Sequence, residues 1–243
     1  GPNADRASAL FGCYSFANHV LANHPGVPLG IAAPKFLDAL RDELGDATIT
    51  YAAGCAVSGT DRSGIAEAAR TAVDADVAIV VVGDQAGLFG RGTCGEGCDT
   101  DTLELPGVQR DLVEAVLATG TPVVLVLLTG RPYAVAWALD ACAAVIQSFF
   151  PGQEGGSAIA GVVSGRVNPS GRLPVSMPAS AAAQPYSYLH PPLGDRSSVS
   201  NLDPSPARPF GFGLSYTTFA YEDLAVATPS VATDGRIEVS LRV

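Results

Sequence analysis

Basic residues are scarce in this sequence of 243 residues. Lysine and arginine together number 14, against 24 aspartates and glutamates, which gives a net charge of −10. An acidic surface repels phosphate backbones, and no cluster of basic residues offsets this charge. We therefore expect no nucleic-acid partner. A neutral ligand such as a sugar is compatible with the balance.

Long hydrophobic runs are also lacking. The longest, at 77–82 and 122–128, are far shorter than the roughly 20 apolar residues that cross a bilayer, so we expect no membrane-spanning helix. Hydrophobic residues nevertheless make up 47% of the chain and charged ones 16%. This length and composition predict one substantial α/β-sized domain and a short further piece.

The number of cysteines is odd, at five. An odd number leaves at least one thiol unpaired within the chain, which excludes a disulfide-framework miniprotein. Cys94 and Cys98 lie four positions apart and could form a local disulfide or half of a zinc site, but no other cysteine or histidine pair has ligand spacing. Two plain thiols are the favoured interpretation, and we expect no metal and no cofactor. The five positions are Cys13, Cys55, Cys94, Cys98 and Cys142.

Helical and strand patterns alternate from residue 33 to about residue 164. The strand patterns at 77–83 and 123–128 are continuous apolar runs, which is typical of strands buried on both faces. Asp61 or Ser63 is expected to cap the helix that ends near residue 74. The alternation predicts an α/β fold with a mostly parallel sheet between helices. The other expected strands are 48–52 and 143–149, and the expected helices are 34–44, 61–74, 108–117 and 154–164.

The character of the sequence changes at residue 168. Eight prolines lie between 169 and 206, which predicts an extended segment over 168–209. Residues 224–243 alternate like two strands of a β-sandwich, so we expect another domain to begin there. Because the chain has no initiator methionine and ends on a strand pattern, we expect it to be part of a longer polypeptide. Its compartment is not predicted.

A glycine-rich, acidic loop at 84–105 follows the strand predicted at 77–83. Ligands of open parallel sheets bind beyond the carboxyl ends of the strands, so this loop is the expected site. Glu96 lies between Gly95 and Gly97, and such a projecting carboxylate can reach a substrate held by another surface. The alternative is that Glu96 is an ordinary solvated loop residue. Candidates for substrate binding in the same loop are Asp84, Phe89 and Arg91, and for Asp84 capping of the following turn is the alternative.

Gly90, Gly92 and Gly95 match the dinucleotide-binding spacing. That fingerprint requires glycines at a strand–helix junction with the pyrophosphate on the helix N-terminus. Here the first glycine comes seven residues after Gly83, and acidic side chains would face the phosphates. We therefore interpret the match as accidental. Trp137, the single tryptophan, is a possible sugar platform, but core packing is favoured.

Several separated motifs resemble the C-terminal α/β domain of glycoside hydrolase family 3. The resemblance implies a six-stranded αβα sandwich over 1–222 that lacks its first strand here, and the opening of a fibronectin-III-like domain over 223–243. The motifs keep the family's order from residue 1 to 217: GPNAD at 1–5, GEGCD at 95–99, LELPGVQ at 103–109, LTGRP at 128–132, FPGQEGG at 150–156, NPSGRLP at 168–174 and FGFGLSYT at 210–217.

The resemblance also implies a chemistry. Members remove single sugars from β-linked glycosides by a retaining reaction, with the nucleophilic aspartate in an N-terminal barrel domain that this chain lacks. Glu96 matches the family's acid/base, so the expected partners are a β-linked glycoside and that barrel, and the chain alone is expected to be inactive. β-Glucosidase and β-xylosidase are both compatible. The alternatives are a non-catalytic carbohydrate-binding or scaffolding module and, less favoured, a nucleotide-binding enzyme.

Overall fold

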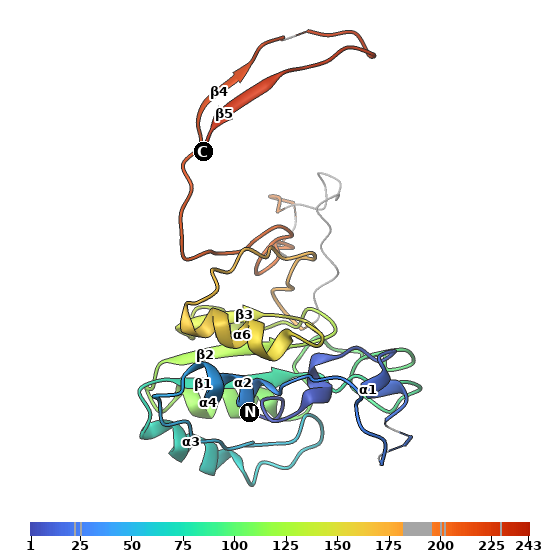
Figure 1. Ribbon diagram of the computed structural model, residues 1–243, viewed down its shortest axis with the longest axis vertical. Helices are drawn as coiled ribbons and strands as arrows, with labels where there is room; N and C mark the ends of the chain where they lie inside the picture. The colour runs from blue at the N-terminus through green and yellow to red at the C-terminus, as the bar shows by residue number, and fades with distance from the viewer. Residues whose placement is uncertain (22, 25, 182–195, 200, 202, 229) are drawn as a thin grey trace.

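The computed structural model describes residues 1–21, 23–24, 26–181, 196–199, 201, 203–228 and 230–243. Four helices come first in the described residues, and helices and strands then alternate between residues 65 and 164 (Figure 1). The helices are η1 (Ala7–Leu10), α1 (Phe16–His19), α2 (Phe36–Glu43), α3 (Ile65–Val73), α4 (Gln109–Leu117), α5 (Ala136–Leu139) and α6 (Gly155–Ser164), and the strands are β1 (Ala78–Gly83), β2 (Val123–Leu128), β3 (Ala144–Gln147), β4 (Glu222–Val226) and β5 (Val239–Arg242).

Strands β1, β2 and β3 form a parallel sheet in that order. Val81 lies opposite Val126, which in turn lies opposite Ile146. Successive side chains of a strand point to opposite faces, so strands without polar residues offer an apolar surface on both sides. The strands predicted at 77–83, 123–128 and 143–149 are confirmed to within a few residues.

Helices cover both faces of this sheet. Val80, Leu125 and Leu127 pack with α3 and α4 in one buried cluster. Val81 and Val126, which point the other way, pack with α2 and α6 in a second cluster. Figure 1 shows α2 and α6 on one side of the sheet and α3 and α4 on the other. The α/β fold and its αβα layering are confirmed, whereas six strands are not, because the parallel sheet of the described residues has three.

The strand predicted at 48–52 is wrong. Within the described residues this segment forms no ladder with β1. Residues 46–52 and 74–81 line a cavity of about 930 Å³. A β pattern indicates a suitable side-chain sequence, but a strand also needs a neighbour at hydrogen-bonding distance.

The helix caps differ from the expectation as well. Helix α3 begins at Ile65, its N-cap is Gly64, and no side chain caps it. The carboxylate of Asp61 instead accepts the backbone N–H of Ser63 at 2.9 Å, which is a local turn one step earlier. The predicted capping by Asp61 or Ser63 is therefore wrong, and the helix starts four residues after Asp61.

Helices α2 and α6 approach each other closely through a glycine. A Cβ on Gly156 would overlap the carbonyl oxygen of Pro34. Both glycines of the motif at 150–156 are buried at the start of α6, so this motif packs the start of the helix against the segment that leads into α2.

The chain beyond residue 167 has few regular elements. In the part of 168–209 that the structure describes, there is no helix or named strand, and one isolated bridge joins Met177 to Arg208. The prolines at 185, 191 and 192 lie outside the described residues. Strands β4 and β5 pair antiparallel with every residue exposed, and the hairpin projects away from the layers in Figure 1. Its assignment to a fibronectin-III-like domain stays a prediction. No described helix has the length and apolar character that a membrane crossing requires.

Candidate active site

The loop at 84–105, called the Glu96 loop below, leaves the carboxyl end of β1 and folds back on itself. Its inner limb, 85–89, runs parallel to its outer limb, 93–96. Three backbone hydrogen bonds join the limbs, from Thr93 to Gln85 at 2.9 Å, from Gly87 to Cys94 at 2.9 Å and from Phe89 to Glu96 at 2.8 Å. The loop therefore has a defined shape without regular secondary structure.

Glycine makes this shape possible at the turn that carries Glu96. Gly95 has φ +131° and Gly97 has φ +68°, values that side-chain-bearing residues rarely adopt. A Cβ on Gly95 would overlap the carbonyl oxygen of Gly87. The outer limb can approach the inner limb only because no side chain stands between them.

Glu96 is exposed at the carboxyl edge of the sheet. Its backbone oxygen is held by Phe89, and its side chain makes no hydrogen bond or ion pair within the described residues. The carboxylate is thus free to contact a molecule outside this chain, while its backbone is restrained. The acid/base role of Glu96 stays a prediction.

Asp84 has a different environment, buried at the root of the loop. Its carboxylate accepts hydrogen bonds from the hydroxyls of Thr93 and Tyr133, both at 2.6 Å, and from the N–H of Gly130 at 2.8 Å. Burial and the Asp84 charge raise the pKa of Tyr133, so its phenol stays a donor. Asp84 therefore ties the Glu96 loop to the turn after β2. The predicted alternative was that Asp84 caps the following turn, whereas its three donors belong to Thr93, Gly130 and Tyr133. Contact between Asp84 and a sugar stays a prediction.

Two further buried polar residues form hydrogen bonds to the backbone at the end of β1, and the sequence patterns did not predict them. Gln109 accepts the N–H of Gly83 at 2.7 Å and donates to its carbonyl at 2.8 Å. The amide of Asn3 donates to the carbonyl of Asp84 at 3.1 Å. A signal was present, since both lie in motifs that carry the family resemblance, GPNAD at 1–5 and LELPGVQ at 103–109. Which backbone groups they satisfy depends on the folded sheet.

Phe89 and Arg91 lie at the tip of the loop. The Phe89 ring is 72% exposed, and its backbone has φ +55°. Such a conformation in a bulky residue is strained, and strain of this kind gathers at functional sites. The Arg91 guanidinium donates to the amide oxygen of Asn23 at 3.0 Å, which links the tip to the segment after α1.

A pocket of about 590 Å³ lies against the inner limb of the loop. Its other wall comes from η1, α1 and the residues near them. The structure thus brings Phe89 and Arg91 together in one pocket, whereas Asp84 lies beneath it and Glu96 is on the adjacent limb. Its lining includes Arg6, Asn18, His19, Asn23, Gln85, Phe89 and Arg91.

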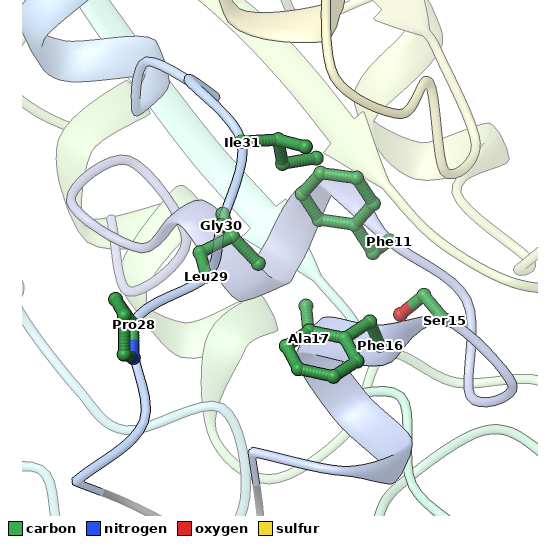
Figure 2. A pocket seen from close by; sticks show the side chains of 8 residues that line it. All are labelled: Phe11, Ser15, Phe16, Ala17, Pro28, Leu29, Gly30 and Ile31. Atoms are coloured by element: carbon green, nitrogen blue, oxygen red, sulfur yellow. The ribbon is translucent and has the colours of Figure 1, made fainter.

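A second, more apolar pocket of about 340 Å³ lies on the other side of α1. Figure 2 shows Phe11 and Phe16 on one side of it and residues 28–31 on the other. Its one hydroxyl, that of Ser15, donates to the carbonyl of Gly12 at 2.7 Å. It offers no group for catalysis.

The loop cysteines are plain thiols, as predicted. All five cysteines are free, and the described residues contain no group of three metal-ligating side chains. Burial raises the pKa of Cys94, and the nearby Asp84 charge raises it further. The helix that follows Gly95 begins only at Gln109, so Gly90, Gly92 and Gly95 do not stand at the strand–helix junction that the dinucleotide fingerprint requires. Trp137 packs against the core, with Arg110 over its ring at 4.8 Å.

The fold and the edge site define a three-layer α/β domain that presents an acidic loop beyond its parallel strands. Residues 1–216 match the glycosyl hydrolase family 3 C-terminal domain. The chain belongs to this family.

Named relatives agree with that assignment. A β-xylosidase of Formosa agariphila is 36% identical, over 100% of this chain and 33% of its own length. A periplasmic β-glucosidase of Salmonella typhimurium is 38% identical, over 74% of this chain and 24% of its own length. Among solved structures, a β-glucosidase from Erythrobacter marinus is similar with a TM-score of 0.74 at 35% identity, covering 87% of this chain and 31% of that one. The chain therefore spans about a quarter to a third of the relatives it matches.

Proposed function

We propose that the full-length protein is an exo-acting, retaining β-glycosidase in which Glu96 is the acid/base. One observation carries the proposal: Glu96 is an exposed carboxylate on a backbone-restrained turn beyond the carboxyl edge of the sheet. The resemblance of the surrounding GEGCD motif and the family membership of residues 1–216 support it.

The reaction needs a second carboxylate, which we assign to an N-terminal barrel domain of the same polypeptide. That carboxylate attacks the anomeric carbon while protonated Glu96 gives its proton to the departing oxygen, so the leaving group departs as an alcohol. Glu96 then takes a proton from water as the water attacks the anomeric carbon and displaces the enzyme carboxylate, which releases the sugar. Retention requires the two carboxyl groups to lie about 5–5.5 Å apart.

The other loop candidates divide into two roles. Asp84 holds the root of the loop, where three donors already surround its carboxylate. Phe89 and Arg91 line the pocket beside Glu96 and are the candidates for direct contact with substrate. Aromatic rings pack on the apolar faces of sugars, and guanidinium groups bind oxygen acceptors.

The acid/base role is tested by Glu96→Ala in the full-length protein. Loss of proton donation should lower kcat/KM by about 10³-fold on glycosides with poor leaving groups and much less on activated ones. Added azide should restore part of the rate and yield a β-glycosyl azide. Glu67→Ala, which removes an exposed carboxylate on α3, is the matched control. Equal losses on all leaving groups without azide rescue would refute the assignment.

Two further measurements define the activity. The 243-residue chain alone should show no turnover, because it supplies one carboxylate of the pair. The full-length protein should be assayed on β-glucosides and β-xylosides in parallel, since both names occur among its relatives. Sugar binding without hydrolysis by the full-length protein would favour the non-catalytic carbohydrate-binding role.

A further inference from the structure

The pocket beside the Glu96 loop has an unusual charge for this protein. The chain carries 24 acidic residues against 14 basic ones, yet no aspartate or glutamate is among the residues that line this pocket. Its ionisable side chains are Arg6, Arg91 and His19. A cationic pocket on an acidic protein selects ligands by charge, because the rest of the surface repels anions.

Neither arginine has a carboxylate partner in the part of the chain that the structure describes. Arg6 donates to the amide oxygen of Gln85 at 3.3 Å, and Arg91 donates to that of Asn23 at 3.0 Å. Asp5, next to Arg6, is instead bound by Lys35 at 2.8 Å. Arg6 is also partly buried, and burial lowers its pKa. A desolvated guanidinium bound only by neutral groups retains capacity for an anion.

The position of the pocket indicates which part of a substrate enters it. The inner limb, which forms one wall, is bonded directly to the outer limb, and the N–H of Phe89 reaches the carbonyl of Glu96 at 2.8 Å. The proton donor of a glycosidase contacts the oxygen that joins the two sugars. In the proposed function the retained sugar is bound next to the nucleophile in the barrel domain, so we place the other group, the leaving group, on the side of this pocket.

We propose that this pocket binds the leaving group of the substrate and selects leaving groups that carry a carboxylate, such as a uronic acid residue, through Arg6 and Arg91. The inference rests on the proposed role of Glu96. Arg91 at the exposed tip would contact the carboxylate first, and Arg6 would hold it from the opposite wall. Phe89 would pack on the sugar ring between the carboxylate and the scissile bond.

The test uses the full-length protein and two disaccharides that differ only in the leaving sugar. One has glucuronate and the other glucose, so a carboxylate replaces a hydroxymethyl group. Arg6→Gln and Arg91→Gln should each lower kcat/KM for the glucuronate substrate by roughly tenfold more than for the glucose substrate, the size of one lost charge-assisted hydrogen bond. The matched control is Arg41→Gln, which removes an exposed charge on α2 outside the pocket.

Added salt supplies an independent measurement. Raising the ionic strength should reduce the preference for the glucuronate substrate in the natural protein and leave the preference of the arginine variants unchanged. Equal losses on both disaccharides, or no loss on either, would overturn the proposal. If the protein hydrolyses neutral glycosides without any response to the carboxylate, the pocket assignment fails and the proposed function stands.

Binding separates a failure of the pocket from a failure of catalysis. In Glu96→Gln, which is expected not to turn over either disaccharide, calorimetric titration should give tighter binding of the glucuronate compound, and adding Arg91→Gln should reduce that difference. Thermal unfolding of each variant checks that it is folded. If Arg91→Gln is not folded, Arg6→Gln is used in its place. Equal affinities for the two disaccharides would refute the proposal even if the protein proves inactive on every glycoside.

Discussion

The root and the tip of the Glu96 loop differ in almost every physical respect. At the root, Asp84, Cys94 and Cys98 are buried, and the Asp84 carboxylate accepts three hydrogen bonds. At the tip, Phe89 and Glu96 are exposed, and a backbone hydrogen bond joins them at 2.8 Å. The loop is therefore held where it meets the core and left open where it can meet a substrate, so changes at the two ends should have separable effects.

The largest effect on stability is expected from Asp84→Ala. This change leaves the hydroxyls of Thr93 and Tyr133 and the N–H of Gly130 without their acceptor in a buried site. Buried donors that lose a charged acceptor cost far more than exposed ones, and we expect a loss of about 3 kcal/mol in the free energy of unfolding. Urea unfolding of the chain measures it.

Asp101→Ala is the control for that experiment. Its carboxylate is exposed in the same loop, and its removal should change the unfolding free energy by less than about 0.5 kcal/mol. Similar losses for both variants would show that Asp84 does not anchor the root.

The next largest effect is expected from Gly95→Ala, compared with Gly90→Ala. Both glycines have positive φ, but a Cβ on Gly95 would overlap the Gly87 carbonyl, whereas one on Gly90 has its nearest neighbour, the Gly97 carbonyl oxygen, at 4.0 Å. Gly90→Ala should cost about 1 kcal/mol for the backbone conformation alone, and Gly95→Ala about 2–3 kcal/mol. Thermal unfolding of the pair measures the difference, and equal costs would contradict the close approach of the two limbs.

At the tip, Phe89→Ala should separate activity from stability. Because its ring is 72% exposed, truncation should change the unfolding free energy by less than about 0.5 kcal/mol. If the ring packs on the leaving sugar, kcat/KM for disaccharides should fall by about fivefold. Kinetics and urea unfolding on the same preparation test both parts. A large loss of stability would show that Phe89 anchors the loop, as the residues at its root do.

The smallest effect concerns the Cys94 thiol. Burial and the Asp84 charge raise its pKa, and only the thiolate reacts with alkylating agents. The thiol therefore stays protonated at pH 8, and its alkylation should accelerate only as the pH rises above its ordinary pKa. Mass spectrometry of the Cys94 peptide after iodoacetamide treatment measures this. Labelling at pH 8 as fast as in the urea-unfolded chain would contradict a buried root.

Sequence patterns were sufficient for elements that bury themselves against their own neighbours. The continuous apolar runs of β1 and β2 and the amphipathic face of α2 agree with the structure to within about two residues. The segment at 48–52 was also predicted as a strand but forms no ladder in the described residues. The number of strands in a sheet depends on which segments become neighbours, and no local pattern contains that information.

The site was predicted in part. The glycines on both sides of Glu96 and their position after a buried strand indicated an exposed carboxylate at the sheet edge. The same reasoning placed Asp84 among the candidates for substrate binding, where the structure has it buried under three donors. Tyr133 and Gln109, which are distant in sequence from Asp84 and Gly83, were missed because their hydrogen bonds exist only after β1 and β2 pair.

The amino-acid order alone determined the class of fold, the placement of the glycine-rich loop after a strand, and the family to which the chain belongs, since each follows from local periodicity or from short motifs. Only the tertiary structure decided which side chains share the loop's root, which line the pocket at its tip, and that the arginines there lack a carboxylate partner within the described residues. Arg6 and Arg91, for example, are 85 residues apart in the sequence but line the same pocket. Such proximity is set by the packing of the folded chain.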